Sequence, residues 1–310
     1  MNAARARAYL PPADRPLRVI VLGSGQKLDV LSEAKRLQPL IQEHAEIAGS
    51  DFTGMEDMSA AQADVAIVLG GDGSILRAAH QMGDRQLPVI AVNLGKLGFL
   101  ADISPGELPE VLISLRGGRL LVAEHLMFEC RVIRPGQPDL RQLGLNEVVI
   151  RTGPPFSLVD IDLYVDSELV TTYSGDGLIV STPVGSTAYA LSAGGPILRK
   201  DLEAFVIMPI SPHTLTDRPV VDSAQRVYEM AVLRPRPEAW VVVDGRVVCR
   251  IGPEDRVRVT RAGVRFQTLT APGHSYYRTL REKLGWSGQL RLKNSPRSPL
   301  PSGEGQGEGG

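Results

Sequence analysis

A glycine-rich turn of sequence GGDGS, residues 70–74, places one carboxylate, Asp72, directly after an apolar run. The run Val65–Leu69 predicts a buried strand, and the turn opens a predicted helix. Backbone N–H groups at such a turn can bind phosphate, which a lone carboxylate would repel. Asp72 is compatible with phosphate if it binds Mg²⁺ or accepts a proton from the attacking group, and both roles suit phosphoryl transfer.

The same turn also has a purely structural interpretation, because Asp-Gly pairs are common in tight turns. It is not a P-loop, since no Gly-Lys-Ser/Thr follows, and its spacing is not that of G-x-G-x-x-G. Its place at the end of a strand in an α/β pattern, where ligands bind, favours a functional role.

Two further segments carry groups that suit a nucleotide. Asn146 and Glu147 offer donors and acceptors to a base edge or to ribose hydroxyls, although a solvent-facing strand start has the same pattern. Residues 174–196, SGDGLIVSTPVGSTAYALSAGGP, combine a second Gly-Asp-Gly around Asp176 with small hydroxyl residues. Tyr189 in this segment could stack on a base. The alternative for the segment is a Ser/Gly-rich linker.

His213 and the pair Asp244–Gly245 are minor candidates. Each is more typical of a structural role, the pair as the turn of a hairpin between VVV and VVC.

Residues 17–118 alternate predicted strands and helices. Continuous apolar strands joined by helical crossovers predict a parallel sheet that is covered on both faces. Pro39 is expected to kink or end the first helix early, and Ser104, Pro105 and Glu107 are expected to open the last one. The predicted strands are LRVIVLG, VAIVL and LPVIAVN, and the predicted helices cover about residues 30–41, 74–82 and 104–115.

From about Leu120 onward the pattern is mostly β. In residues 159–165 apolar side chains alternate with polar ones, which predicts a half-buried antiparallel strand. Short strands separated by turn residues follow, and this spacing predicts a sandwich-like domain. The further predicted strands are GLIVST, AFVIMPI, RVYEMAVL, AWVVVDG, RVRVT and VRFQTLT, and a short helix is expected over Tyr276–Leu284.

The length of 310 residues suggests about two domains, and the net charge of −1 gives no electrostatic reason to expect nucleic acid or an anionic membrane. No apolar run approaches the roughly 18 residues of a spanning helix, and no signal peptide is expected. Cys130 and Cys249 lack metal-ligand spacing and predict free thiols in a reducing cytoplasm. The predicted organisation is a flexible arm over 1–16, an α/β domain over 17–119, a β-rich domain over 120–288 and a disordered tail over 289–310.

Together these blocks resemble the NAD kinase family over roughly Leu17–Trp286. GGDG alone is shared with diacylglycerol kinases, sphingosine kinases and 6-phosphofructokinases, whereas the segment from the second Gly-Asp-Gly to Thr-Ala-Tyr is highly specific. The matching blocks, in the family's order, are GGDGS, NLGKLGFL, NEVVI, SGDGLIVSTPVGSTAYALSAGGP, PHTLTDRP and VVDGR.

The resemblance implies an α/β N-terminal domain with a parallel sheet, a mostly β, sandwich-like C-terminal domain that binds NAD, and a site between them. It implies transfer of the γ-phosphoryl group of ATP, or in some members of polyphosphate, to the 2′-hydroxyl of the adenosine ribose of NAD. Mg²⁺ or another divalent metal is the implied cofactor, and the family's homodimers or homotetramers are the implied assembly. NAD and ATP are then the partners, without nucleic acid or membrane, in the cytoplasm.

The implied site residues follow by matching position. Asp72 matches the aspartate that takes the ribose proton, and Asp176 matches the second carboxylate of the pocket. Arg77 falls where the family often places a basic residue near phosphate. The residues expected to contact NAD or ATP are Asp72, Gly73, Arg77, Phe99, Asn146, Glu147, Ser174, Asp176, Thr187, Ala188, Tyr189, Ser192 and Arg246, and no residue is assigned as a metal ligand.

Two positions depart from the family pattern. Many members have Arg where this chain has Ser174, and many have Gln where it has Arg246. Our hypothesis is that the lost and the gained cation offset each other near the phosphates or bases of the dinucleotide.

Two other functions are compatible with parts of this sequence. A lipid kinase of the diacylglycerol kinase type shares the Gly-Gly-Asp-Gly turn, but would need a basic or apolar membrane-facing surface. A non-catalytic NAD-binding sensor would keep the pocket, but would not require Asp72.

Overall fold

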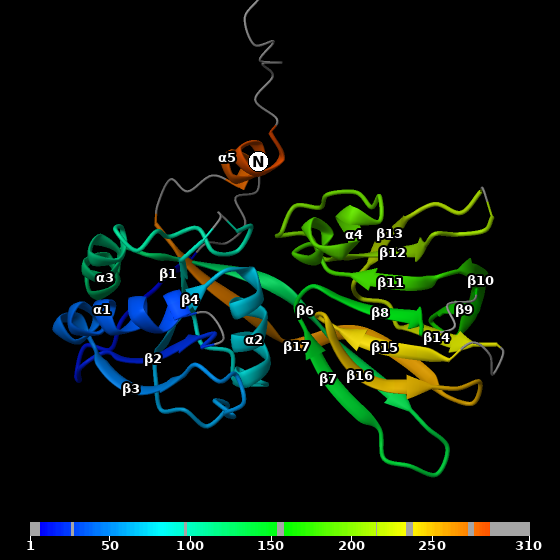
Figure 1. Ribbon diagram of the computed structural model, residues 1–310, viewed down its shortest axis with the longest axis horizontal. Coiled ribbons are helices and arrows are strands. Elements are labelled where there is room, and N and C mark those ends of the chain that lie inside the picture. Colours follow the sequence, from blue (N-terminus) through cyan, green and yellow to red (C-terminus); the bar gives the residue numbers. More distant parts are fainter. Residues whose placement is uncertain are drawn as a thin grey trace, which may run out of the picture. The chain divides into compact units, whose positions relative to one another are not determined.

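The computed structural model describes residues 7–25, 28–95, 98–153, 158–214, 216–233, 238–271 and 276–285 (Figure 1). The described residues up to Ala271 form one compact unit, and helix α5 (Tyr276–Leu284) belongs to a second. Helix α5 matches the predicted helix, and Arg278 and Glu282 form an ion pair along it. Among the described residues, no helix has the length and apolar character needed to cross a membrane.

The N-terminal part is built on the predicted parallel sheet. Its strands are β2 (Arg18–Gly23), β3 (Glu46–Asp51), β4 (Val65–Gly70) and β5 (Val89–Asn93), which lie in the order β3-β2-β4-β5. Each pairs in parallel with its neighbour. The carboxyl ends of these strands therefore meet along one edge, where the GGDGS turn follows β4.

Helices cover both faces of this sheet, as predicted. Alternate residues of β2 point to opposite faces, so Val19 and Val21 join one core cluster while Ile20 and Leu22 join another. The first cluster includes helices α1 (Leu28–His44) and α3 (Leu108–Arg116), and the second includes α2 (Asp72–Met82).

Three of the predicted helix limits are wrong. Helix α1 continues through Pro39 to His44, and the buried side chains of Leu37 and Ile41 on either side pack its last turns into the core. This packing outweighs the one backbone hydrogen bond that proline removes.

The second wrong limit is the start of α3. The backbone N–H of Ser104 donates to the Glu107 carboxylate at 2.8 Å, as in a capping box, and the Ser104 hydroxyl donates to the same carboxylate at 2.7 Å. Residues 105–107 nevertheless form a turn, and the helix begins only at Leu108. Helix α2, in contrast, begins two residues before the predicted start, so that Asp72 is its first residue.

The C-terminal part is a sandwich of two antiparallel sheets, as predicted. Residues from both sheets, such as Phe128 and Val241, share one buried core. The first sheet has the order β13-β12-β11-β8-β15-β16 and consists of β8 (Glu147–Thr152), β11 (Gly177–Ser181), β12 (Ala204–Ile210), β13 (Val220–Ser223), β15 (Ala239–Val243) and β16 (Arg246–Ile251). The facing strands include β7 (Leu140–Gly144), β9 (Val159–Val165), β10 (Glu168–Gly175) and β14 (Tyr228–Val232).

Two long strands join the parts (Figure 1). Strands β6 (Leu121–Ile133) and β17 (Arg256–Thr270) pair along their lengths, and Thr268 of β17 also pairs with Val89 of β5. One 11-stranded sheet therefore runs from the parallel part into the sandwich. The prediction of two separate strands, RVRVT and VRFQTLT, is wrong, because an irregularity between Arg261 and Arg265 lets the strand continue.

Residues 7–16 lie within the expected flexible arm but are held by the fold. Strand β1 (Arg7–Ala8) pairs with β6, Tyr9 is buried, and Arg15 donates two hydrogen bonds to Asp64. Residues 1–6 and the predicted tail after residue 288 lie outside the described residues.

One buried carboxylate fixes the loop after β3 to helix α2. Asp51 accepts hydrogen bonds from the N–H groups of Thr53 and Gly54, from the Thr53 hydroxyl and from Gln81 of α2, at 2.6–2.8 Å. Burial alone would raise the pKa of Asp51, but these donors lower it to about 2.

We expect Asp51→Asn to lower the free energy of unfolding by about 1–3 kcal/mol, because the amide replaces one acceptor with a donor. Urea unfolding at pH 7 measures this loss. Because the pKa of Asp51 is depressed, its contribution is complete above the unfolded pKa, near 4, and is lost as the pH falls through about 2. Asp57→Asn is the control, since Asp57 caps Ser59 in an exposed turn, and an equal loss there would contradict the prediction.

Candidate functional site

Asp72 is bound by the loop that follows β5. Its Oδ2 accepts a hydrogen bond from the backbone N–H of Phe99 at 2.8 Å. Its Oδ1 accepts bonds from Leu100 and Ala101 at 3.0 and 3.1 Å. Three consecutive N–H groups therefore orient one carboxylate at the first turn of α2, where the helix dipole also favours negative charge.

Two glycines shape the space around Asp72. A Cβ on Gly98 would lie 2.1 Å from Asp72 Oδ1, so only glycine allows the loop to come this close. A Cβ on Gly73 would meet nothing within 4 Å, so the N-terminus of α2 is open beside Asp72. This opening leaves room for a second molecule next to the carboxylate.

Arg77 lies one turn further along α2, over the loop that Asp51 fixes. Its Nη1 donates to the carbonyl of Thr53 at 3.3 Å, and its side chain packs against Gly54. The guanidinium is thus held against the loop that follows β3.

Asp244 organises the start of β8, which the sequence did not reveal. The expected hairpin between β15 and β16 forms, and its turn residue Asp244 has a positive φ of 47°. The buried carboxylate accepts bonds from the backbone N–H groups of Leu145, Asn146 and Glu147 at 2.8, 2.8 and 3.1 Å. It therefore fixes the backbone of the Asn-Glu pair.

The same carboxylate contacts helix α2. His80 Nε2 lies 3.2 Å from Asp244 Oδ2, an ion pair when the imidazole is protonated. Helix α2 carries Asp72 at its start and His80 two turns later. This contact joins the helix of the first candidate carboxylate to the segment that holds Asn146 and Glu147, and no sequence signal singled out His80.

Glu147 is a buried carboxyl group with unused hydrogen-bonding capacity. Burial, with the nearby charge of Asp244, raises the pKa of Glu147 to about 8, while the backbone N–H of Tyr189 partly offsets this rise. Its Oε2 is buried and has no hydrogen-bond partner among the described residues. At neutral pH this side chain is therefore mostly protonated and can donate a hydrogen bond.

The hydroxyl residues of segment 174–196 divide into two groups. Ser181, Thr182 and Ser186 are fully buried and bond to backbone groups, so they hold the segment rather than face a ligand. Thr187 ends the short helix η1 (Gly185–Thr187) and donates to the Val184 carbonyl. Ala188 then leads into α4 (Tyr189–Ser192), where Tyr189 is 37% exposed and Ser192 is also exposed.

Tyr189 and Asp176 line one cavity of about 290 Å³ together with Arg151, Thr152 and Ile210. The structure thus brings the second Gly-Asp-Gly carboxylate next to the Thr-Ala-Tyr block, and Tyr189 links this cavity to Glu147.

Three expected site residues lie outside these contacts. Ser174 is in β10, where its carbonyl accepts the His213 N–H, and Arg246 begins β16 with an exposed side chain. Among the residues that the structure describes, the hydrogen bonds of Asn146, Glu147 and Tyr189 do not extend to Ser174, Ser192 or Arg246.

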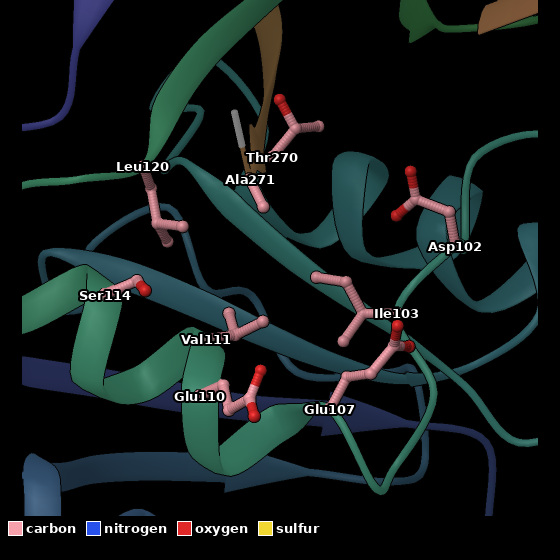
Figure 2. A pocket seen from close by; sticks show the side chains of 9 residues that line it. All are labelled: Asp102, Ile103, Glu107, Glu110, Val111, Ser114, Leu120, Thr270 and Ala271. Atoms are coloured by element: carbon pink, nitrogen blue, oxygen red, sulfur yellow. The ribbon is translucent and has the colours of Figure 1, made fainter. Parts of the chain in front are cut away.

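A second cavity, of about 190 Å³, opens between α3 and the end of β17 (Figure 2). Asp102, Glu107 and Glu110 contribute carboxylates to its lining, together with apolar groups such as Val111 and Leu120. The acidic lining disfavours a phosphate ligand, and none of the expected site residues lines it.

Comparison with known proteins relates this geometry to one family. The family model of the ATP-NAD kinase N-terminal domain matches residues 17–119, and that of the C-terminal domain matches residues 145–271. An NAD kinase of Rhodopirellula baltica is 53% identical over 279 residues, which is 90% of each chain. An NAD kinase of Geotalea daltonii is 37% identical over 82% of this chain and 89% of the relative.

Solved structures agree. The crystal structure of an NAD kinase from Archaeoglobus fulgidus in complex with ATP has a TM-score of 0.66 and 27% identity, covering 87% of this chain and 99% of that chain. Yeast NADH kinase complexed with NADH shares the fold, with a TM-score of 0.79 at 22% identity, over 93% of this chain and 96% of that chain. The two domain models and the extent of these matches establish that the chain belongs to the NAD kinase family of phosphotransferases.

Proposed function

We propose that this protein transfers the γ-phosphoryl group of ATP to the 2′-hydroxyl of the adenosine ribose of NAD, with Asp72 as the general base. Membership of the NAD kinase family and the ATP complex of the Archaeoglobus fulgidus relative support the two substrates. The observation that carries the role of Asp72 is its carboxylate, held by three N–H groups beside the open N-terminus of α2.

The hydrogen bonds of Asp72 leave capacity for the incoming hydroxyl. Two carboxylate oxygens offer about four acceptor sites, and Phe99, Leu100 and Ala101 use three. The remaining site, on Oδ2, accepts the ribose 2′-hydroxyl. The O2′–Pγ bond forms as the bond from Pγ to the bridging oxygen breaks, ADP departs with that electron pair, and the ribose proton passes to Asp72.

Glu147 and Asn146 would hold the dinucleotide. The protonated Glu147 can donate to one ribose oxygen and accept from another, and its unpartnered Oε2 gains a partner when the ligand binds. Tyr189 would stack on a ring of the dinucleotide in the cavity that it shares with Asp176. Thr187, Ala188 and Ser192 complete the proposed lining, and Arg77 would meet phosphate.

Mg²⁺ would neutralise charge on the transferring phosphates when bound. Among the described residues, no group of three or more His, Cys, Asp or Glu side chains could form a protein cage for a metal ion. In this proposal the ion is carried by the phosphates of ATP, in line with the preference of Mg²⁺ for few protein ligands.

The remaining parts of the proposal concern setting and assembly. Cys130 and Cys249 are both free, which suits a reducing cytoplasm. A homodimer or homotetramer is the proposed assembly, in line with the family. Neither a lipid kinase nor a non-catalytic sensor is favoured by the relatives.

We expect Asp72→Asn to lower kcat at least about a hundredfold with KM for NAD changed only a fewfold, because the amide cannot take the proton. A coupled assay of NADP formation from NAD, ATP and Mg²⁺ measures both constants. Asp29→Asn, in the first turn of α1, is the control for removing a helix-start charge. A kcat within a fewfold of wild type would exclude Asp72 as the base.

Gly98→Ala should also lower kcat, by about tenfold or more, because the new methyl group would displace the carboxylate of Asp72. Gly95→Ala in the same loop is the matched control, since a Cβ there meets nothing within 4 Å. The comparison is made in the same NADP assay after circular dichroism has verified that both variants fold. Equal activities of the two variants would contradict the proposed placement of Asp72.

The free energy of unfolding should decrease as the pH rises from about 5 to 9, since the pKa of Glu147 is about 8 in the folded protein and near 4 when unfolded. In this window the folded state binds the proton more tightly, so raising the pH favours unfolding. Glu147→Gln should flatten this dependence in thermal unfolding followed at pH 6 and pH 9. An unchanged slope in the variant would show that Glu147 is not the group that titrates.

A further inference from the structure

Lys200 places a cation beside the loop that holds Asp72. It lies between α4 and β12, outside the residues that the sequence motifs singled out, and is partly buried. Its Nζ donates a hydrogen bond to the Phe99 carbonyl oxygen. The N–H of the same residue, Phe99, donates to Asp72 Oδ2 at 2.8 Å. A single loop residue therefore connects the ammonium group to the candidate base.

The charges around Lys200 fit this arrangement. Burial lowers the pKa of Lys200, while the charges of the Asp102 and Asp72 carboxylates act in the opposite direction. A further titratable neighbour is His125 of β6, which bonds to Thr268 at 2.9 Å. Burial, together with the charge of Lys200, lowers the pKa of His125 to about 3, so this imidazole is neutral at physiological pH.

The segment that carries Lys200 is also anchored to the Thr-Ala-Tyr block. The backbone N–H of Leu198 donates to the hydroxyl of Ser186 at 2.9 Å, and both residues are buried. Ser186 is followed directly by Thr187 and, after Ala188, by the exposed Tyr189. Thr187 and Tyr189 are among the residues proposed to line the dinucleotide cavity. One continuous stretch of chain thus runs from that cavity to the loop around Asp72.

We propose that Lys200 is a positioning residue for Asp72. Its ammonium group holds the Phe99 carbonyl, and through it the loop whose three N–H groups donate to Asp72. Its positive charge also offsets the negative charges of Asp72 and Asp102 where a triphosphate must approach. This inference rests on the proposed function, since holding Asp72 in place serves the reaction only if Asp72 is the general base. It also explains how an anionic donor can come close to two carboxylates. A cation at this place lowers the electrostatic barrier without entering the reaction.

The first test compares Lys200→Met and Lys200→Arg in the full-length chain. Lys200→Met should lower kcat about 10- to 100-fold with KM for NAD within about threefold, since a shifted base impairs the chemical step rather than binding. Lys200→Arg keeps the charge and should recover kcat to within about fivefold of wild type. Lys35→Met, on the exposed surface of α1, is the matched control. A kcat of Lys200→Met within twofold of wild type, or a loss that Arg does not restore, would overturn the proposal.

A second test does not depend on the reaction. Urea unfolding of wild type, Lys200→Met, Asp72→Asn and the double variant forms a double-mutant cycle. We expect the effect of Asp72→Asn to be clearly different in the Lys200→Met background, whereas additive effects would refute the coupling. If the wild type forms no NADP, the proposed function fails, and the cycle still decides whether Lys200 acts on Asp72.

Discussion

The site depends on one constraint: a carboxylate must stand at the start of a helix with its orientation fixed and one acceptor position open. Asp72 meets this constraint because its carboxylate accepts hydrogen bonds from three consecutive N–H groups, those of residues 99–101. Asp244 repeats the device on residues 145–147. In both places a short acidic side chain accepts hydrogen bonds from backbone N–H groups that regular strand pairing does not use. Backbone groups, and not other side chains, therefore set the orientation of the carboxylate.

Helix α2 connects these two carboxylates. It carries Asp72 at its first position and reaches Asp244 through His80, while Gln81 binds the buried Asp51. A displacement of α2 would therefore disturb both ends of the proposed site together. Lys200 adds a connection from the sandwich to the same loop, so the two parts are linked at the site by charge as well as by the shared sheet.

Local patterns predicted much of the fold. Three of the four strands of the parallel sheet, several strands of the sandwich and helix α5 follow from apolar periodicity, because each element buries one face. Strand β3, which has few buried apolar residues, and the long strand β6 were not predicted. The continuation of α1 through Pro39 depends instead on core packing, and the joining of RVRVT with VRFQTLT depends on pairing with β6. Contacts between residues that are distant in the sequence decide both features, and the sequence alone does not reveal those contacts.

The candidate site was predictable to a similar extent. Asp72, Asn146, Glu147, Asp176 and Tyr189 stand in motifs, and the structure places them beside openings or buried polar partners. His80 and Lys200 stand in no motif, since their importance comes from neighbours brought close by folding. Ser181 and Ser186 resembled ligand contacts in the sequence, although their buried hydroxyls bond to the backbone. The sequence does not distinguish a hydroxyl that bonds to the backbone from one that faces a ligand.

The pairing of β17 with β5 has a consequence for synthesis of the chain. Val89 lies in the first third of the sequence, but its partner Thr268 lies close to the end of the last strand. A ribosome therefore releases the parallel sheet with its β5 edge unpaired, and that edge stays open until nearly the whole sandwich has been made. An open strand edge is a template for pairing with strands of other chains, so the β5 edge is exposed to such pairing until β17 emerges.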